Sequence, residues 1–418
     1  MADPVKEREG FDVIVHLLGE QRLPVCLGIR QFKCPRHIVV HSGVPEEVRD
    51  SLLRVVGADV RIEGVRVHPY DPHESREKIL SALGNISGRA VAFNLTGGTK
   101  LMFAGASAAC EHISGKPFYI ETLRNELIWL DRDFTRTPII QIRSVEPFFL
   151  LNGFRILKPG LWDDDPARAA RIELTLSLWS HARTLGGRGV YRDIAEFNDK
   201  PGQPFHIEGP FIRAELSRTG QASLDIGDIH YRCDRWPDFA RYLSGGWFEE
   251  FTYLQLKPLL ESQRIRDLRI GLKIDWQTPV QNSGTFGAQE FDVAFTDGHR
   301  LTLIECKAGA LRTEHVMTLE NHVRHYGGVV SIGALATVFP PHPSTRKKIE
   351  CSSSICGFLG NAMEDKFVKN IVIAEPGQVF SGPIPGGKAP SRPPRHSGAH
   401  SRGFRPLENA FRDLGGTR

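Results

Sequence analysis

The alternation of short apolar runs with helical patterns over residues 1–145 is the feature that most restricts the fold. Apolar runs typical of strands occupy residues 11–18, 37–41, 90–95, 117–122 and 127–130. Helical patterns begin near Pro45 and His73, and a third runs from about Lys100 to His112. Strands that are apolar along their length and alternate with helices are typical of a mostly parallel sheet covered on both faces. The sequence therefore predicts an α/β, Rossmann-like open sheet.

Three further stretches follow this first unit. Residues 146–243 contain a helical pattern at 171–185 and a second at 191–197, which predicts a helical or winged-helix bridge. Residues 244–380 read as helix, strand, strand, helix, strand, which predicts a second α/β unit. Residues 381–418 hold six Pro and seven Gly with few apolar side chains. Such a tail cannot bury enough apolar surface to offset the entropy lost on ordering, so we expect it to be disordered.

The net charge of +4 comes from this tail. Residues 381–418 hold seven Lys or Arg against two Asp or Glu, whereas residues 1–380 hold 46 basic and 47 acidic side chains. The charge of the body is therefore no sign of a nucleic-acid partner.

Other features exclude several classes of protein. No apolar run approaches the roughly 20 residues of a membrane-spanning helix, and the polar, charged start is unlike a secretory signal. The seven cysteines are scattered without a zinc or disulfide spacing, which is typical of reduced thiols. We therefore expect a cytoplasmic protein without a membrane partner.

The first candidate site is a glycine turn after a buried strand. Residues 91–95 run directly into Thr96-Gly97-Gly98-Thr99-Lys100, where a helix is expected to begin. Adjacent glycines allow a tight turn and close approach of a ligand, and free N–H groups at a helix start favour anions. Open α/β sheets bind ligands at the carboxyl ends of their strands. The segment lacks the glycine spacing of Walker and dinucleotide motifs, and a plain structural turn is the alternative.

The second candidate site is an expected hairpin within residues 290–307. Along its first strand, Glu290 and Asp292 alternate with Phe291, Val293 and Phe295. Asp297-Gly298 is typical of a two-residue turn. With that turn, Asp292 lies opposite position 303 and is a diagonal neighbour of Glu305.

The residues of this hairpin suit a cation and a phosphate. Asp292 and Glu305 supply two carboxylates which, with a backbone carbonyl, suit Mg²⁺ or Mn²⁺. Lys307 shares a face with Glu305 and is placed to orient a water or to stabilise charge on a phosphate. A surface ion pair is the alternative interpretation.

An amphipathic helix that precedes the hairpin adds further acids. Trp247, Phe251 and Leu254 recur at helical spacing as its expected buried stripe. Glu249 and Glu250 flank this stripe, and the periodicity does not choose between them.

Three segments of the first unit resemble the CARF family, the CRISPR-associated Rossmann-fold sensors of cyclic oligoadenylates. They are Asn94-Leu-Thr-Gly-Gly-Thr-Lys-Leu-Met102, Gly19-Glu-Gln-Arg-Leu-Pro24 after the first strand, and His41-Ser-Gly-Val-Pro-Glu-Glu47 after the second. The resemblance implies that a CARF homodimer of residues 1–145 binds a cyclic oligoadenylate, with cyclic tetra-adenylate expected. The ligand-binding residues that it implies are Gln21, Leu23, Pro24, Ser42, Thr96, Gly97, Gly98, Thr99 and Lys100.

Residues 244–380 resemble a PD-(D/E)XK nuclease core, an α/β/α restriction-endonuclease-like domain. Gly246 to Glu249 is similar to the helical G-x-x-E pattern of that superfamily, which favours Glu249 over Glu250. The resemblance implies a catalytic set of Glu249, Asp292, Glu305 and Lys307, and an Mn²⁺ or Mg²⁺ ion held by Asp292, Glu305 and Cys306. The helix expected at 313–326 does not clearly supply the Gln or Lys of the superfamily pattern.

A CARF-like sensor joined to such a core resembles the ancillary nucleases of type III CRISPR antiviral systems. The resemblance implies a metal-dependent endonuclease that the ring activates allosterically and that cleaves single-stranded RNA or DNA. Two other functions stay open. One is a transcriptional regulator that binds DNA through a winged helix in residues 146–243. The other is a ring nuclease that degrades its own activator.

Overall fold

The computed structural model describes most of the chain between residues 10 and 380. The described residues are 10–43, 46–85, 88–122, 124–187, 205–208, 212–216, 221–234, 236–276, 288–328, 331–359 and 379–380. The helix expected at 191–197 and the tail at 381–418 lie outside them. Among the described helices, none combines the length and the apolar character that a bilayer span needs.

The first sheet has seven strands in the order β3-β2-β1-β4-β5-β6-β7. Strands β1 to β5 pair in parallel, and β6 and β7 join antiparallel at one edge. The strands are β1 (Val13–Leu17), β2 (Arg36–His41), β3 (Arg61–Arg66), β4 (Val91–Asn94), β5 (Lys116–Glu121), β6 (Glu126–Trp129) and β7 (Arg136–Pro138). The α/β sheet predicted for residues 1–145 is therefore confirmed.

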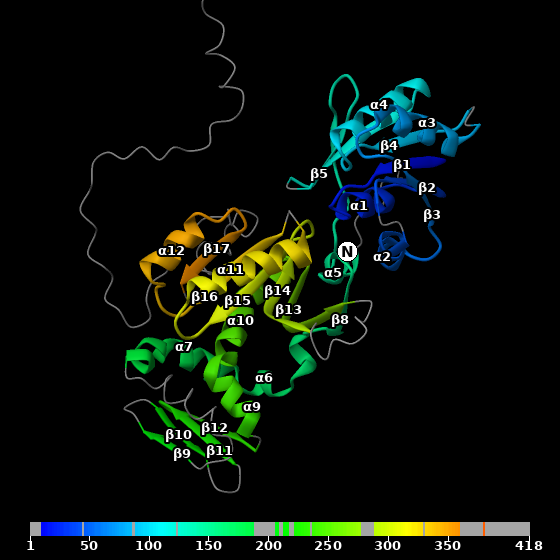
Figure 1. Cartoon of the computed structure of the whole chain (residues 1–418). Coiled ribbons are helices and arrows are strands. Elements are labelled where there is room, and N and C mark those ends of the chain that lie inside the picture. Colours follow the sequence, from blue (N-terminus) through cyan, green and yellow to red (C-terminus); the bar gives the residue numbers. More distant parts are fainter. Residues whose placement is uncertain are drawn as a thin grey trace, which may run out of the picture. The chain divides into compact units, whose positions relative to one another are not determined.

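Four helices cover the two faces of this sheet. They are α1 (Leu23–Gln31), α2 (Glu46–Val56), α3 (Pro72–Leu83) and α4 (Lys100–His112). Helices α3 and α4 lie on one face, and α1 and α2 lie on the other (Figure 1). Strand β1 serves both layers because its side chains alternate: Val13 and Val15 pack with α3 and α4, whereas Ile14 packs with α1 and α2.

The sequence patterns did not predict α1 and β3. Strand β3 is an edge strand in which charged residues alternate with Ile62 and Val65, so it lacks the continuous apolar run of its neighbours. Helix α1 contains Pro24 in its first turn, where proline is tolerated, and Gly28 at its centre. A Cβ at Gly28 would lie 2.8 Å from Asn94 Nδ2, so this glycine lets the helix approach β4.

A second sheet of seven strands has the order β18-β17-β16-β15-β14-β13-β8. Its strands are β8 (Phe154–Lys158), β13 (Asp267–Trp276), β14 (Gln289–Thr296), β15 (Leu301–Lys307), β16 (Ile332–Thr337), β17 (Ile355–Leu359) and β18 (Val379–Phe380). Strands β8, β13, β14 and β15 pair antiparallel, and β15 to β18 pair in parallel.

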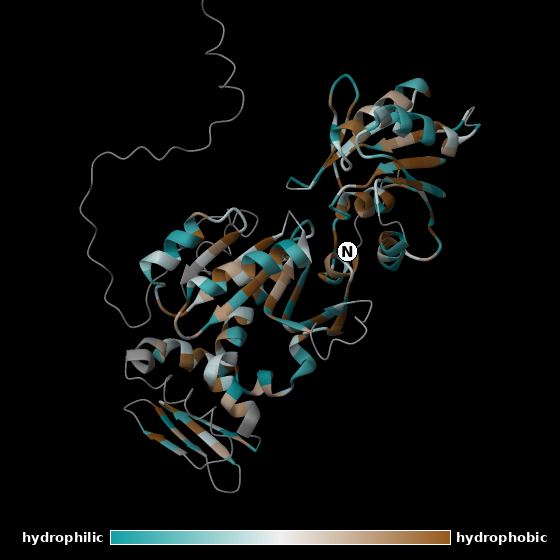
Figure 2. Ribbon diagram, in the orientation of Figure 1, coloured by the Kyte–Doolittle hydropathy of each residue, from teal (hydrophilic) through white to brown (hydrophobic). Residues whose placement is uncertain are grey.

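Helices cover both faces of the second sheet and give it α/β/α layers. Helix α10 (Trp247–Glu261) packs on one face, and α11 (Thr313–His322) and α12 (Pro343–Glu350) pack on the other. Hydropathy follows the layering in both sheets: β1, which is buried along its length, is mostly hydrophobic, whereas the largely exposed α12 is mostly hydrophilic (Figure 2).

Residues 146–243 do not only connect the two larger units, since they also supply a strand of the second sheet. Strand β8 lies within them but pairs with β13, with Ile156 opposite Ile274, so the second sheet begins before residue 244. The remaining elements are α5 (Glu146–Leu151), η1 (Trp162–Asp164), α6 (Ala167–Ala170), α7 (Ile172–Gly187), β9 (Phe205–Glu208), β10 (Ile212–Leu216), β11 (Ala222–Ile226), β12 (Ile229–Cys233), α9 (Trp236–Arg241) and η2 (Tyr242–Gly246).

Strands β9 to β12 form an antiparallel sheet in the order β12-β11-β10-β9. This sheet differs from the expected helical or winged-helix bridge. In β11 the residues alternate between buried and partly exposed positions. The four strands are only four or five residues long, so their period of two is too brief to stand out among the surrounding Gly, Pro and Asp.

Candidate functional site

The loops after β1 and β4 meet where the strand order of the first sheet reverses. Strand β1 pairs with both β2 and β4, so these loops leave neighbouring strands at their carboxyl ends, the usual ligand position in open α/β sheets. A Cβ on Gly19 would lie 3.0 Å from Gly98 N, and one on Gly97 would lie 2.8 Å from Gly19 N. Gly98 also has a φ of +76°. The glycines are therefore needed for the contact between the two loops.

Asn94 supports both loops from within the sheet. Its Nδ2 donates to Pro24 O at 3.0 Å and lies 3.2 Å from His16 Nδ1. Its Oδ1 accepts from Thr96 N at 3.2 Å and from Thr96 Oγ1 at 2.6 Å. His16 Nε2 lies 3.0 Å from His37 Nδ1. Asn94, His16 and His37 are all buried, so this network holds the two loops at a fixed separation.

The two histidines of this network are held neutral. Burial lowers the pKa of His16 well below its ordinary value, and the charge of His37 lowers it further. Burial lowers the pKa of His37 to about 4. A neutral His16 that accepts from Asn94 at Nδ1 carries its proton on Nε2 and donates it to His37.

Within the glycine turn, the predicted ligand residues present different groups. Thr96 Oγ1 accepts from Ile120 N at 2.8 Å in addition to its bond with Asn94. Thr99 Oγ1 donates to Pro69 O and caps α4 by accepting from Met102 N. Both hydroxyls are thus engaged inside the protein, and the exposed Lys100 is the charged group of the turn.

The other predicted ligand residues lie beside the turn. Leu23 and Pro24 are buried in the first turn of α1, where Pro24 supports Asn94 through its carbonyl. Gln21, like Gly97 and Gly98, is partly exposed, and Ser42 is exposed after β2. The structure thus brings together the loops after β1 and β4, and it leaves Leu23 and Pro24 in the core.

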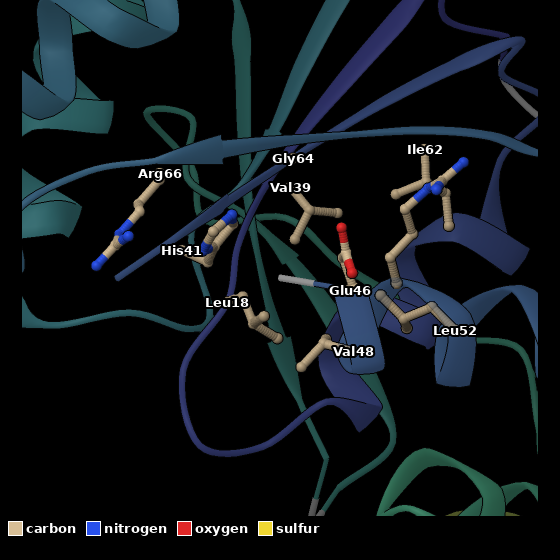
Figure 3. Close-up of a pocket in the computed structure, with 10 residues that line it drawn as sticks. Leu18, Val39, His41, Glu46, Val48, Leu52, Ile62, Gly64 and Arg66 are labelled. Carbon is tan, nitrogen blue, oxygen red and sulfur yellow. The ribbon is translucent and has the colours of Figure 1, made fainter. Parts of the chain in front are cut away.

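A cavity of about 290 Å³ opens beside these loops, between α2 and strands β2 and β3 (Figure 3). Its lining mixes apolar and charged side chains: Leu18, Val39, His41, Glu46, Val48, Arg49, Leu52, Ile62, Gly64 and Arg66. Leu18 and His41 directly precede Gly19 and Ser42 in the sequence. The cavity therefore adjoins two predicted ligand segments, although residues 96–100 do not line it.

In the second sheet, β14 and β15 form the predicted hairpin with a longer turn. Thr296 pairs with Leu301, so residues 297–300 connect the strands and not Asp297-Gly298 alone. Asp297 Oδ1 accepts from the N–H groups of His299 and Arg300, each at 2.9 Å, and this closes the turn. The predicted register is therefore wrong by two residues. Extension of the observed pairs sets Asp292 directly opposite Glu305 and not diagonal to it.

The apolar alternation of β14 is broken at Asp292. Phe291 packs in the core beneath α11, whereas Val293 packs beneath α10. The pairs with β13 on either side are Leu272 with Phe291 and Ile270 with Val293, and Gly271 between them has a φ of +63°. An irregularity of this kind turns a side chain away from the regular pleat, and Asp292 Oδ2 accepts from Cys306 N at 2.7 Å.

Glu305 and Lys307 lie on one face of β15, and Cys306 points to the opposite face. Lys307 Nζ forms an ion pair with Glu305 Oε1, and both side chains are only about a quarter exposed (28% and 27%). Cys306 Sγ contacts Thr252 Oγ1 at 3.4 Å inside the core, and burial raises the pKa of its thiol well above the ordinary value. The backbone carbonyl is therefore the group that Cys306 has to offer a cation.

Glu249 and Glu250 of α10 lie in different surroundings. Glu250 is 3% exposed and accepts from Arg171 Nε at 3.1 and 3.0 Å. Arg168 Nε lies 3.9 Å from the same carboxylate. Glu249 is partly exposed and lies close enough to Asp292 for the two charges to interact. Glu250 thus binds α10 to the helices before it, and Glu249 adjoins the acids of the hairpin.

Burial and mutual repulsion perturb these acids. Burial raises the pKa of Glu249 to about 7, while Arg241 opposes this rise and Glu290 adds to it. Burial also raises the pKa of Asp292, and the charges of Glu249 and Glu305 raise it further. Carboxylates with raised pKa values in one place are typical of functional sites.

The donor groups fit a hard divalent cation by type and by charge. Asp292 and Glu305 supply carboxylates and Cys306 supplies a carbonyl, which are the oxygen ligands that Mg²⁺ and Mn²⁺ prefer. A divalent cation relieves the repulsion that raises the pKa of Asp292. Within the described residues, no group of three or more His, Cys, Asp or Glu side chains is arranged to hold a metal ion.

Three charged residues beside this cluster received no role from the sequence. Glu290 accepts from Arg241 Nη2 at 2.7 Å and lies 3.0 Å from Lys273 Nζ. The period-two pattern of residues 267–276 is the signal that could have placed Lys273 on a strand. No local pattern marks Arg241.

Comparison with known proteins assigns a family to part of the chain. Residues 237–322 match the family model described as Card1-like, endonuclease domain. This region, which contains α10 and the hairpin, is therefore a Card1-like endonuclease domain. No curated protein matches the chain.

Solved structures share the fold of most of the chain. Can2 from Sulfobacillus thermosulfidooxidans, in complex with cyclic tetra-adenylate, has a TM-score of 0.68 at 17% identity and covers 88% of this chain and 100% of its own. Protein VC1899 from Vibrio cholerae has a TM-score of 0.67 at 15% identity, with coverage of 86% and 97%. A type III CRISPR defence DNA nuclease activated by cyclic oligoadenylate has a TM-score of 0.51 at 18% identity, with coverage of 84% and 48%. The predicted fold, a CARF-like α/β unit joined to an α/β domain that matches an endonuclease family, is therefore confirmed.

Proposed function

We propose that this protein is a metal-dependent endonuclease of type III CRISPR defence that a cyclic oligoadenylate activates, with cyclic tetra-adenylate as the activator. The observation that carries the proposal is the cluster of Glu249, Asp292, Glu305 and Lys307 inside the region that matches the Card1-like endonuclease domain. Its proposed substrate is single-stranded RNA or DNA.

The proposed roles follow from the contacts of each side chain. Asp292, Glu305 and the carbonyl of Cys306 hold Mn²⁺ or Mg²⁺. When bound, such an ion stabilises negative charge on the scissile phosphate and lowers the pKa of a water. Lys307, which Glu305 positions, donates hydrogen bonds to the attacking water or to a phosphate oxygen. Glu249 orients the water from α10.

The activator is proposed to bind at the loops after β1 and β4. The partly exposed Gly97 and Gly98 offer backbone N–H groups, and Lys100 offers a positive charge to the phosphates of a ring. The structural likeness to Can2 solved with cyclic tetra-adenylate supports this ligand. A homodimer would place two such turns about a two-fold axis, which matches the symmetry of the ring.

A hydrogen bond connects the first of these loops to a helix next to the second sheet. Arg22 Nη1 donates to Leu151 O, at the end of α5, over 2.6 Å. Helix α5 directly precedes β8, which pairs with β13. A ring that binds one arrangement of the loop more tightly than another would shift the position of α5 and of the strands that follow.

The nuclease assignment is tested by substitution in the cluster. Cleavage of labelled single-stranded RNA, single-stranded DNA and supercoiled plasmid is measured with Mn²⁺ and the ring. We expect Asp292→Asn, Glu305→Gln and Lys307→Met each to lower the rate about 100-fold or more. The control is Glu261→Gln, an exposed acid at the end of α10. Wild-type rates in all three cluster variants would contradict the assignment.

A further inference from the structure

The residues Arg241, Lys273 and Glu290 form a charged triad at the surface beside the acidic cluster, with Glu290 partly buried. Glu290 uses one carboxylate oxygen for each cation, with Oε1 2.7 Å from Arg241 Nη2 and Oε2 3.0 Å from Lys273 Nζ. The side chain of Arg241 is 62% exposed and that of Lys273 is 39% exposed. The triad therefore carries a net positive charge at the surface.

Three elements bring the triad next to the proposed reaction centre. Lys273 pairs with Glu290 across β13 and β14, and Glu290 is two residues before Asp292. Arg241 ends α9, shortly before the start of α10 and Glu249. The charge of Arg241 interacts with both Glu249 and Asp292. Arg241 thus lies beside the acids, and Glu290 connects Lys273 to it.

The triad is a poor stabiliser of the fold. Exposed ion pairs contribute about 0–1 kcal/mol because solvent screens them and the long side chains lose entropy. A guanidinium and an ammonium held side by side on the surface are instead well suited to a phosphodiester, which offers Arg two oxygens in the geometry of its N–H groups.

We propose that Arg241 and Lys273 bind a backbone phosphate of the nucleic-acid strand adjacent to the scissile phosphodiester, and that Glu290 pairs with the two cations until that phosphate replaces it. The proposal rests on the proposed nuclease function and names where the substrate strand lies. Arg168, another basic residue near Glu290, is not available to the strand. It is buried, and its Nη1 donates to Leu161 O at 2.8 Å and to Trp162 O at 3.1 Å.

The experiment measures cleavage by the full chain with the ring and Mn²⁺, using single-stranded DNA and single-stranded RNA. We expect Arg241→Ala and Lys273→Ala each to raise KM about tenfold, since one phosphate contact is lost, and to leave kcat within about twofold. Each variant should also flatten the dependence of log(kcat/KM) on log[salt] by about 0.7. Glu290→Gln, which releases both cations, should lower KM.

The matched control is Arg155→Ala. Arg155 Nη2 forms an ion pair with Asp275 Oδ2 at 3.1 Å within the same sheet, and its side chain is 49% exposed. We expect its KM and salt dependence to equal those of the wild type. If Arg241→Ala and Lys273→Ala behave like this control, or lower kcat at constant KM, the proposal is overturned.

Strand binding without cleavage separates this proposal from the nuclease assignment. Fluorescence anisotropy in EDTA, with the ring present, measures the affinity of the same labelled strands. Weaker binding by Arg241→Ala and Lys273→Ala, but not by Arg155→Ala, supports the phosphate contact even if the wild type cleaves nothing. Equal affinity in all variants overturns the contact even if the wild type cleaves in a ring-dependent way.

Discussion

Thr96 positions the predicted ligand loop through bonds made inside the protein. Its Oγ1 donates to Asn94 Oδ1 at 2.6 Å and accepts from Ile120 N at 2.8 Å. The exposed parts of the loop are then its amide groups and Lys100. A ligand that binds there contacts a backbone whose conformation Thr96 and Asn94 maintain.

Thr96→Val should therefore weaken the proposed binding of the ring by altering the shape of the loop. Valine keeps the shape but leaves Ile120 N and Asn94 Oδ1 without this partner, which costs about 1–3 kcal/mol of unfolding free energy. We expect a lower midpoint in urea unfolding and a higher Kd for cyclic tetra-adenylate by calorimetry. The control is Thr137→Val in the short edge strand β7. A Kd equal to the wild-type value would show that the hydroxyl does not shape the loop.

The buried pair His16 and His37 makes stability depend on pH. Their pKa values are lowered in the folded state, to about 4 for His37, so the unfolded chain binds more protons below about pH 6.5. The free energy of unfolding is therefore unaffected by these histidines above this pH. It falls as the pH is lowered towards 4, by up to about 1.4 kcal/mol per pH unit for each histidine. Urea unfolding at pH 7.5, 6 and 5 measures the loss. His37→Gln should reduce the slope, and an unchanged slope would contradict the account.

For single residues, the sequence predicted which segments approach the candidate sites better than it predicted which side chains make contacts there. The CARF-like motif placed Leu23 and Pro24 with the ligand residues, but both are buried in α1. A motif match shows which stretch approaches a site, whereas the atom that faces it depends on packing against distant residues such as Asn94. The choice between Glu249 and Glu250 was open for the same reason, because Arg171 lies far away in the sequence.

Among the elements, helix α10 is fixed on one side by a buried ion pair. Arg171 at the start of α7 binds Glu250 through two nitrogens and also binds Asp165 at 2.8 Å. Because Glu249 directly precedes Glu250 in α10, this contact positions the helix that carries a proposed catalytic acid.

Arg171→Met should be strongly destabilising, because it leaves the carboxylate of Glu250 buried without its main partner. We expect a loss of about 3–5 kcal/mol in urea unfolding. The exposed pair of Arg155 and Asp275 is the comparison, and Arg155→Ala should cost about 0–1 kcal/mol. Similar losses in the two variants would show that the Glu250 pair is not a structural contact.

Helices and strands with a strong hydrophobic periodicity were predicted well, whereas segments that mix apolar and charged residues were not. Helix α4 begins and ends where the pattern placed it, at Lys100 and His112. Strand β13 was not predicted, although Leu268, Ile270, Leu272 and Ile274 alternate with charged residues along it. The hairpin register was two residues out, because Asp297 bonds to backbone groups beyond Gly298 and lengthens the turn.

For the whole molecule, the resemblance to known families predicted the architecture better than the composition did. The near-neutral body gave no sign of a nucleic-acid partner, yet three short motifs and the spacing of a few acids predicted a CARF-like fold joined to a nuclease-like domain. The match of residues 237–322 and the shared fold of Can2 agree with that architecture. The four-stranded sheet β9–β12 was not predicted, and the motifs of the two larger sheets contain no information about it.

The most direct test of the account is the rate at which the wild-type chain cleaves single-stranded nucleic acid in Mn²⁺ as cyclic tetra-adenylate is titrated. The account predicts little cleavage without the ring, a rise that saturates at about one ring per dimer, and no rise in Glu305→Gln. Cleavage that is equal with and without the ring, or that persists in Glu305→Gln, would contradict it.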